Sequence, residues 1–325
     1  MRILLIGDLH LSERSRDAYR FGIFKWVAEQ QKQFNPHATI FMGDITDRKD
    51  KHSSILVNRI VDEFTKLERY YVLMGNHDYI DPSSPFFKFL GNRFIYEATQ
   101  IGRLLFIPHT HSKDEFATIC NTFKHVEIDY VFCHQTFEGA IAETGARLNG
   151  LRQAYVDALQ PRLGVYAGDI HRPQRAGNVV YVGSPYHIRF GDDFDPRCIL
   201  LDDKGHAKNL YFDSLRKWSL TVRDPADILK NRLLFKNDQV VLTIELAREE
   251  SVDWKAHKRA ILEACKQKGL EVFGVDLKVN STTPSKAKEN GKLSASTPET
   301  IVDEFCRVES LPKPTKQAGH DLLRE

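Results

Sequence analysis

Short apolar runs that each end in polar residues are the feature that most constrains how this chain can fold. Five of them read as buried strands, and each leads into one of these groups: Asp8-Leu9-His10, Gly43-Asp44, Gly75-Asn76-His77-Asp78, His134 and Asp169-Ile170-His171. The carboxyl ends of buried parallel strands meet at one edge of a sheet, so groups far apart in the sequence can converge there. One polar residue after a strand is an ordinary turn. Five groups that offer only carboxylate, imidazole and amide side chains indicate a site.

The order of expected elements predicts an α/β domain with mixed sheets over residues 1–212. Helices are expected at 17–34 and 54–68, where apolar residues recur at helical spacing and Asn35-Pro36 stops the first. Strands are expected at residues 104–107, 130–133, 163–167, 179–182 and 198–201. Short strands crowd together after residue 160 between Gly and Pro turns, which predicts that part of the sheet is antiparallel.

A second, smaller unit is expected from residue 213 to 280. It combines strands at 218–222, 239–246 and 270–279 with helices at 225–234 and 252–268, which predicts a small α+β domain. Residues 281–297 are rich in Ser, Thr, Lys and Pro and are expected to form a linker or mobile loop. Residues 298–325 are expected to form a helical tail, with Thr297 as the N-cap of its first helix.

Composition excludes several classes of protein. A formal charge of +2 over 325 residues is too small to predict a nucleic-acid partner without local basic patches. The five cysteines are widely spaced and contain no C-x-x-C pair, which favours a reducing compartment over a disulfide framework or a structural zinc site. No apolar run reaches the ~18 residues of a membrane span, so we expect a cytoplasmic protein with no membrane partner.

The residue types at the strand ends suit a pair of divalent cations. Oxygen and imidazole ligands without thiolate favour manganese, magnesium, iron or zinc. A carboxylate between two cations can bridge them, and such a pair holds the attacking and leaving oxygens of a displacement at phosphorus. Gly75 lets the chain turn without the penalty of a Cβ atom. The pattern therefore predicts a hydrolytic two-metal site.

In order and setting, these five groups resemble the calcineurin-like metallophosphoesterases. A finer similarity is to the SbcD-type DNA nuclease subunits, which partner a coiled-coil ABC-type ATPase; it is carried by GDIHRPQ (168–174), GSPYHIRFGD (183–192) and TPETIVDEF (297–305). The resemblance implies a two-sheet β-sandwich flanked by helices and followed by the small capping domain. It also implies a homodimer through the 54–68 helix, although core packing already accounts for the apolar positions of that helix.

The resemblance also implies a role for each residue. The first metal takes Asp8, His10 and His171, the second takes Asn76, His134 and Asp169, and Asp44 bridges the two. His77 does not bind metal; it faces the scissile phosphate and protonates the leaving oxygen or stabilises charge. Mn²⁺ is the expected metal, with Mg²⁺ as the alternative. The family usually has histidine where this chain has Asp169, so Asp169 either binds metal directly, which we favour, or orients His171.

Other polar residues have less specific roles. We expect His109 and His111 to lie in a surface loop rather than to bind metal, and Asp78 to brace its own loop. Asp47 either orients the site or belongs to a solvated turn. The basic residues expected to contact a DNA backbone, with solvated loops as the alternative, are Arg48, Lys49, Lys51 and Arg172.

The expected function is a two-metal phosphodiesterase that cleaves DNA, as the nuclease subunit of an ABC-ATPase-coupled exonuclease in DNA repair, recombination or replication. One alternative is a phosphodiesterase or phosphatase of small nucleotides. Another is a non-catalytic member that binds DNA or the ATPase. Protein Ser/Thr phosphatases of this superfamily resemble Gly-Asp-x-x-Asp-Arg-Gly and Gly-Asn-His-Glu; here Lys49 follows Arg48 and Asp78 follows His77, which argues against that activity.

Overall fold

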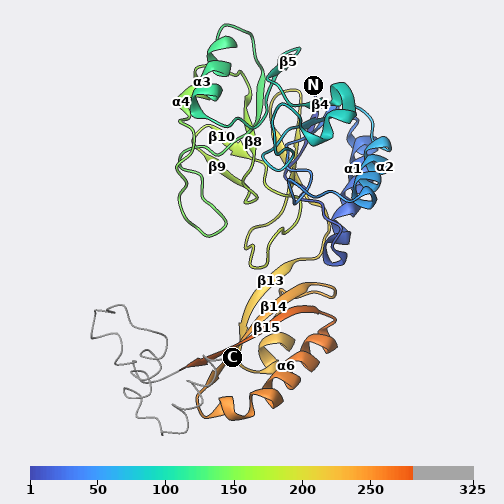
Figure 1. Ribbon diagram of the computed structural model, residues 1–325, viewed down its shortest axis with the longest axis vertical. Helices are drawn as coiled ribbons and strands as arrows, with labels where there is room; N and C mark the ends of the chain where they lie inside the picture. The colour runs from blue at the N-terminus through green and yellow to red at the C-terminus, as the bar shows by residue number, and fades with distance from the viewer. Residues whose placement is uncertain (281–325) are drawn as a thin grey trace, which may run out of the picture.

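The computed structural model describes residues 1–280, which form a large body built on two sheets and a small body built on a third (Figure 1). The first sheet has the order β12-β11-β1-β2-β3-β4. Its strands β1 to β4 are parallel, whereas β11 pairs antiparallel with both β1 and β12. The bounds are β1 (Ile3–Ile6), β2 (Ala38–Phe41), β3 (Tyr70–Leu73), β4 (Phe94–Ile95), β11 (Cys198–Leu201) and β12 (Ala207–Leu210).

The second sheet has the order β5-β6-β7-β8-β10-β9. Its four inner strands are parallel, and the edge strands β5 and β9 are antiparallel to their neighbours. The bounds are β5 (Thr99–Ile101), β6 (Leu104–Ile107), β7 (Tyr130–His134), β8 (Gly164–Gly168), β9 (Gln174–Ala176) and β10 (Val179–Tyr181). Both sheets are thus mixed, and the expected antiparallel pairs after residue 160 are confirmed.

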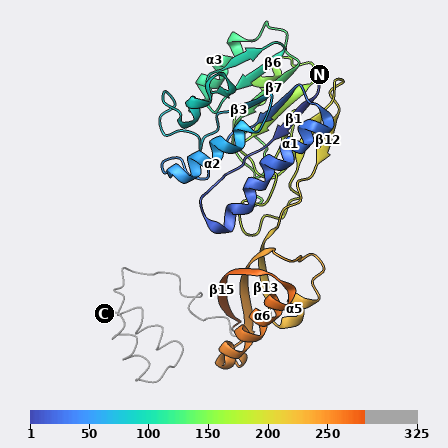
Figure 2. The same cartoon turned by 90° about the vertical axis from the view of Figure 1, so that its right-hand side faces the viewer.

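Alternating side chains along the strands build a sandwich with helices on both outer faces. Ile3 and Leu5 enter the core between the sheets, where they meet residues of the second sheet such as Phe132. Leu4 and Ile6 point the other way, into the core beneath α1 (Gly22–Phe34) and α2 (Ser54–Thr65). Figure 2 shows these two helices on the outer face of the first sheet, and α3 (Lys113–Thr122) and α4 (Ala154–Asp157) cover the second. The expected β-sandwich flanked by helices is confirmed.

Local signals explain where most helices begin and end. α1 follows the 3₁₀ segment η1 (Ser15–Phe21) and ends at Asn35, which adopts the left-handed conformation (φ 46°). The side chain of Ser53 accepts a hydrogen bond from the N–H of Leu56 at 3.2 Å and caps α2. The helix expected at 17–34 is thus divided into η1 and α1. α3 and the 3₁₀ segment η2 (Phe86–Arg93) were not expected from the sequence.

The small body is a three-stranded parallel sheet in the order β13-β14-β15, with a helix in each crossover. Its bounds are β13 (Lys217–Val222), α5 (Pro225–Leu229), β14 (Gln239–Ala247), the 3₁₀ segment η3 (Glu250–Asp253), α6 (Trp254–Lys268) and β15 (Glu271–Asn280). Parallel pairing makes this a β-α-β-α-β unit, a connectivity that the expectation of α+β structure did not specify. The expected linker and tail, 281–297 and 298–325, lie outside the described residues. Within residues 1–280 there is no helix long and apolar enough to cross a membrane.

Candidate metal centre

All seven residues predicted to bind metal lie at one edge of the sandwich. In the first sheet, Asp8 and His10 follow β1, Asp44 follows β2 and Asn76 follows β3. In the second sheet, His134 is the last residue of β7, and Asp169 and His171 follow β8. The carboxyl ends of the parallel strands in both sheets therefore supply the site, as the strand-end argument predicts.

Glycines allow the strand ends to approach one another closely. A Cβ atom on Gly75 would lie 2.3 Å from Oδ1 of Asp44, and one on Gly43 would lie 2.4 Å from Nδ1 of His134. Gly43 also has a positive φ of 105°, whereas Gly75 does not have a positive φ. The expected reason for Gly75, freedom to turn, is therefore incomplete: what excludes a larger residue is contact with a neighbouring strand end.

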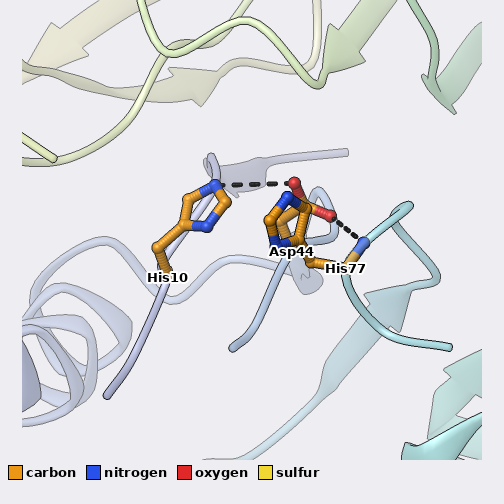
Figure 3. Close-up of side chains that lie close together, drawn as sticks. All are labelled: His10, Asp44 and His77. Carbon is orange, nitrogen blue, oxygen red and sulfur yellow. Dashed lines mark hydrogen bonds and ion pairs between the residues drawn. The ribbon is translucent and has the colours of Figure 1, made fainter. Parts of the chain in front are cut away.

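Asp44 lies at the centre of the site, between two imidazoles. Its Oδ2 is 3.5 Å from Nε2 of His10, and its Oδ1 is 3.4 Å from Nε2 of His134. The backbone N–H of His77 donates to Oδ1 at 2.8 Å (Figure 3). The residue is 2% exposed, and its backbone has a positive φ of 53°. Each carboxylate oxygen thus faces a different histidine.

On one side of Asp44, two imidazoles face each other. Nε2 of His10 and Nε2 of His171 are 2.9 Å apart, and both side chains are buried. Oδ2 of Asp8 is buried and has no hydrogen-bond partner among residues 1–280, whereas Oδ1 accepts from the N–H of Asp169 at 2.8 Å. Lone pairs of nitrogen and oxygen that converge in this way are suited to a cation.

On the other side, the amide oxygen of Asn76 faces only acceptors. It lies 3.3 Å from Nε2 of His134 and 3.0 Å from each carboxylate oxygen of Asp44. Reversal of the amide would place its N–H groups against these atoms; a cation bound by the amide oxygen would satisfy the same three atoms. Nδ1 of His134 lies 2.6 Å from the carbonyl oxygen of Met42 and donates to it, which leaves Nε2 with a free lone pair.

Asp169 reaches this second side. Its Oδ1 is 3.9 Å from Nε2 of His134, and its Oδ2 accepts from the hydroxyl of Thr136. The carboxylate beside Nδ1 of His171 belongs instead to Glu143, at 3.4 Å. The role of orienting His171, one of the two considered for Asp169, thus has a better-placed candidate in Glu143. Thr136 lies only two residues after His134, whereas Glu143 lies in a loop that carries none of the strand-end groups.

His77 is half-buried beside His10, with ring centroids 4.8 Å apart. Its Nδ1 is 2.9 Å from the carbonyl oxygen of Asp47 and donates to it, so Nε2 remains free for a substrate or a cation. A ring nitrogen of His77 also lies within 4.8 Å of ligand atoms of His10 and Asp44. The carbonyl of Asp47 thus orients the ring of His77, which is one of the two roles considered for Asp47.

Asp78 braces the loop, as expected. Its Oδ2 accepts from the N–H groups of Asp44 (2.9 Å) and Gly75 (2.8 Å), and its Oδ1 accepts from the N–H of Ile45 (2.9 Å). The carboxylate is fully buried and joins the loops after β2 and β3. It holds Asp44 in place without facing the centre itself.

Burial and close pairing shift the pKa values of the site. Burial raises the pKa of Asp8 and lowers that of His10 well below its usual value. Burial also opposes ionisation of both Asp44 and His134, but their mutual attraction outweighs it. The pKa of Asp44 is therefore held well below its usual value and that of His134 well above. The pKa shift of Asp44 favours its ionised form, which is the form that binds a cation.

His109 lies closer to the centre than the surface-loop expectation implies. Its Nδ1 is 2.6 Å from the hydroxyl of Tyr79, and its ring centroid is 6.2 Å from that of His134. His111 is exposed, as expected. Among residues 1–280, neither histidine belongs to a group of side chains close enough to share a cation; those groups are His10, Asp44 and His77, and Asp8, Asp44 and His134.

A cavity of about 480 Å³ opens beside His10 and His171 and extends toward the small body. Its basic lining residues are Arg14, Arg16, Arg20, Arg189 and Lys217. The residues expected to contact DNA lie elsewhere: Arg48, Lys49 and Lys51 are exposed outside this lining, and Arg172 pairs with Asp193 at 3.0 Å. Their DNA contacts stay a prediction.

The family model for calcineurin-like phosphoesterases matches residues 1–173, more than half of the chain and every strand end of the site. The chain belongs to the calcineurin-like phosphoesterases. This phosphoesterase is also similar to a protein named exonuclease subunit 1 of Enterobacteria phage T4: the two are 22% identical over 346 aligned positions, which cover 100% of this chain and 97% of the phage protein. The resemblance inferred from the strand ends is confirmed at the level of the family.

The side chains fit the two divalent cations that the family implies. The facing imidazole nitrogens of His10 and His171 and the unpartnered oxygen of Asp8 form one set of donors. The amide oxygen of Asn76, Nε2 of His134 and Oδ1 of Asp169 form the other. Both sets consist of oxygen and imidazole nitrogen atoms, which are the atoms that divalent cations bind, and Asp44 lies between the two sets.

Proposed function

We propose that this phosphoesterase is a metal-dependent phosphodiesterase that cleaves DNA, as the nuclease subunit of an ATPase-coupled exonuclease. The observation that carries the proposal is the complete donor set around Asp44, one carboxylate oxygen facing His10 and the other His134. Similarity to the phage exonuclease subunit over the full chain favours DNA as the substrate.

Within this proposal, each donor set holds one cation. Asp8, His10 and His171 hold the first, Asn76, His134 and Asp169 hold the second, and Asp44 is shared. Mn²⁺ is the cation we propose, with Mg²⁺ as the alternative, because the donors are oxygen and imidazole without thiolate. When bound, the pair supplies Lewis-acid activation of water and neutralisation of the phosphate charge.

The side chains of the protein orient the reacting groups. The carbonyl of Asp47 accepts from Nδ1 and fixes the ring of His77, so that the doubly protonated ring can donate its Nε2 proton to the leaving oxygen. The N–H of His77 holds Asp44, which couples the position of the proton donor to that of the bridging carboxylate. Arg14 and Arg189 line the adjoining cavity and are suited to contact phosphates of the strand.

The test is hydrolysis of duplex DNA with Mn²⁺, measured beside hydrolysis of bis(4-nitrophenyl) phosphate. We expect His77→Ala to lose at least ~100-fold in rate on DNA and still to bind two Mn²⁺ per chain by calorimetry. His206→Ala, which removes an exposed histidine paired with Asp202, is the matched control and should keep full activity.

Several outcomes would count against the assignment. Undiminished cleavage by His77→Ala would remove its role as proton donor, and loss of one bound Mn²⁺ would make it a ligand instead. Cleavage of the small diester without cleavage of DNA would favour a nucleotide phosphodiesterase. Wild-type protein that binds Mn²⁺ but cleaves neither substrate would favour a non-catalytic member.

The ATPase partner is proposed to be a coiled-coil ABC-type subunit that docks on residues 298–325, in DNA repair, recombination or replication. The phage relative is named as a subunit, which supports an assembly. Removal of residues 297–325 should abolish co-purification with the ATPase and leave Mn²⁺-dependent diester hydrolysis intact. Retained co-purification would place the docking surface within residues 1–296.

A further inference from the structure

Three charged side chains are buried together where the small body meets the large one. Asp17 and Arg20 lie in η1, Lys217 begins β13, and none is more than 2% exposed. Nζ of Lys217 is 2.6 Å and Nη2 of Arg20 is 3.1 Å from the same oxygen, Oδ1 of Asp17. The hydroxyl of Ser12 donates to Oδ2 at 2.8 Å. We call Asp17, Arg20 and Lys217 the junction triad.

Stability alone does not account for this triad. Each buried ion loses favourable hydration free energy, and apolar replacements of buried ion sets are often neutral or stabilising. The triad also connects the large body to the small one. Any other group that its side chains contact is therefore positioned relative to both bodies.

Arg20 connects the triad to the metal centre. Its Nη1 donates to the backbone carbonyl of His10, and its Nη2 donates to the carbonyl of Ile188 at 3.0 Å. His10 has a positive φ of 44°, which is strained for a residue other than glycine and persists only where the surroundings hold it. The preceding carbonyl, of Leu9, accepts from the hydroxyl of Tyr186 at 2.6 Å. The backbone that presents the His10 ring is thus held from outside its own strand.

Lys217 brings the small sheet into this chain of contacts. Besides Asp17, its Nζ faces the carbonyl of Ile188 at 3.4 Å. On the next strand, the side chain of Gln239 donates to the carbonyl of Arg16 at 2.8 Å. Strands β13 and β14 therefore both contact η1, the segment from which Arg20 reaches His10. A displacement of the small sheet would move Asp17 and Arg20 and, through them, His10.

We propose that Lys217, Asp17 and Arg20 are positioning residues that make the first cation site depend on how the β13-β14-β15 sheet is seated. The inference rests on the proposed function in one respect, that His10 binds a cation. The small body then forms part of the metal centre instead of being an independent appendage, and a DNA strand or subunit that tilts this sheet alters Mn²⁺ affinity.

The test is Mn²⁺ calorimetry on the full chain with Lys217→Met and Arg20→Met. Loss of a residue that orients a ligand typically weakens metal affinity 10–100-fold, so we expect each variant to weaken one of the two Mn²⁺ sites by about tenfold or more. The matched control is Lys278→Met: this lysine lies in the same sheet and pairs with Glu245 at 2.8 Å, but it is exposed and lies outside the cavity. It should bind Mn²⁺ within twofold of the wild type.

A second substitution at Lys217 keeps the test decisive if Lys217→Met folds poorly. Lys217→Gln keeps an N–H donor toward Asp17 without the charge, and it serves if Lys217→Met does not fold. Folded Lys217 and Arg20 variants that bind both Mn²⁺ ions as the wild type does, whatever their thermal stability, would overturn the inference and leave the triad a structural contact. Wild-type protein that binds no Mn²⁺ would instead contradict the proposed function, before any variant is compared.

Discussion

Replacement of Gly75 by alanine tests whether close approach of strand ends builds the metal centre. The new Cβ atom would lie 2.3 Å from Oδ1 and 2.4 Å from the backbone nitrogen of Asp44, and 2.8 Å from Cε1 of His134. Carbon atoms in ordinary contact are ~3.5–4 Å from their neighbours. To relieve the overlap, the neighbouring atoms must move by about 1 Å. Those atoms belong to Asp44, the proposed bridging carboxylate, and to His134, a proposed ligand of the second cation.

The expected cost appears in two quantities. Overpacking of a close-packed region typically lowers the free energy of unfolding by ~1–3 kcal/mol. Displacement of a reacting group by 1 Å can lower the rate by ~100-fold, so Gly75→Ala should lose about that factor in Mn²⁺-dependent hydrolysis of bis(4-nitrophenyl) phosphate. The measurements are steady-state rates and urea unfolding of the metal-free protein.

The matched control is Gly274→Ala, another glycine without a positive φ, in β15. A Cβ atom there would have its nearest contact at 3.4 Å, with a side-chain methyl of Val241, so the substitution should leave the rate unchanged. Gly75→Ala with a rate within twofold of the wild type would refute the reasoning, because the strand ends would then have room that the structure does not show.

Two further substitutions examine the surroundings of the centre. Asp78→Ala leaves three buried N–H groups without their acceptor and should cost roughly 3 kcal/mol of unfolding free energy, whereas Asp81→Ala, which removes an exposed carboxylate, should cost much less in the same urea titration. Burial and the nearby Arg20 lower the pKa of Lys217 from 10.5 to about 8, so between these pH values the unfolded chain binds more protons than the folded one. The stability of the wild type relative to Lys217→Met should therefore rise by roughly 3 kcal/mol from pH 8 to 10.5; a constant difference would contradict this.

Much of the centre could be predicted from the sequence because its signals are local. Each proposed ligand is the end of an apolar run or lies within a few residues of one, and parallel strands place such ends at a common edge. Asp78 could be expected to brace its loop because a carboxylate just after a turn finds N–H groups close by. The helix stop at Asn35-Pro36 is also local.

The residues that the sequence did not reveal act across long separations. Glu143 and Thr136 reach His171 and Asp169 from a loop about thirty residues earlier in the chain. The basic cavity draws Arg14, Arg189 and Lys217 from three separate regions. Glu143, Arg14 and Lys217 have no periodicity or neighbouring motif that distinguishes them from other polar residues, whereas Thr136 follows His134 by two residues and Arg189 lies within GSPYHIRFGD (183–192).

By itself, the sequence determined which residue types end the strands, and therefore the chemistry of the site and the family. Tertiary structure alone decided how close those ends come, so that Gly75 is required by contact with Asp44 rather than by its own turn. It also decided that Lys217 of the small sheet completes a buried triad behind His10. The physical reason is that backbone preference and burial pattern are encoded over a few residues, whereas contact distance and charge pairing depend on where remote segments pack.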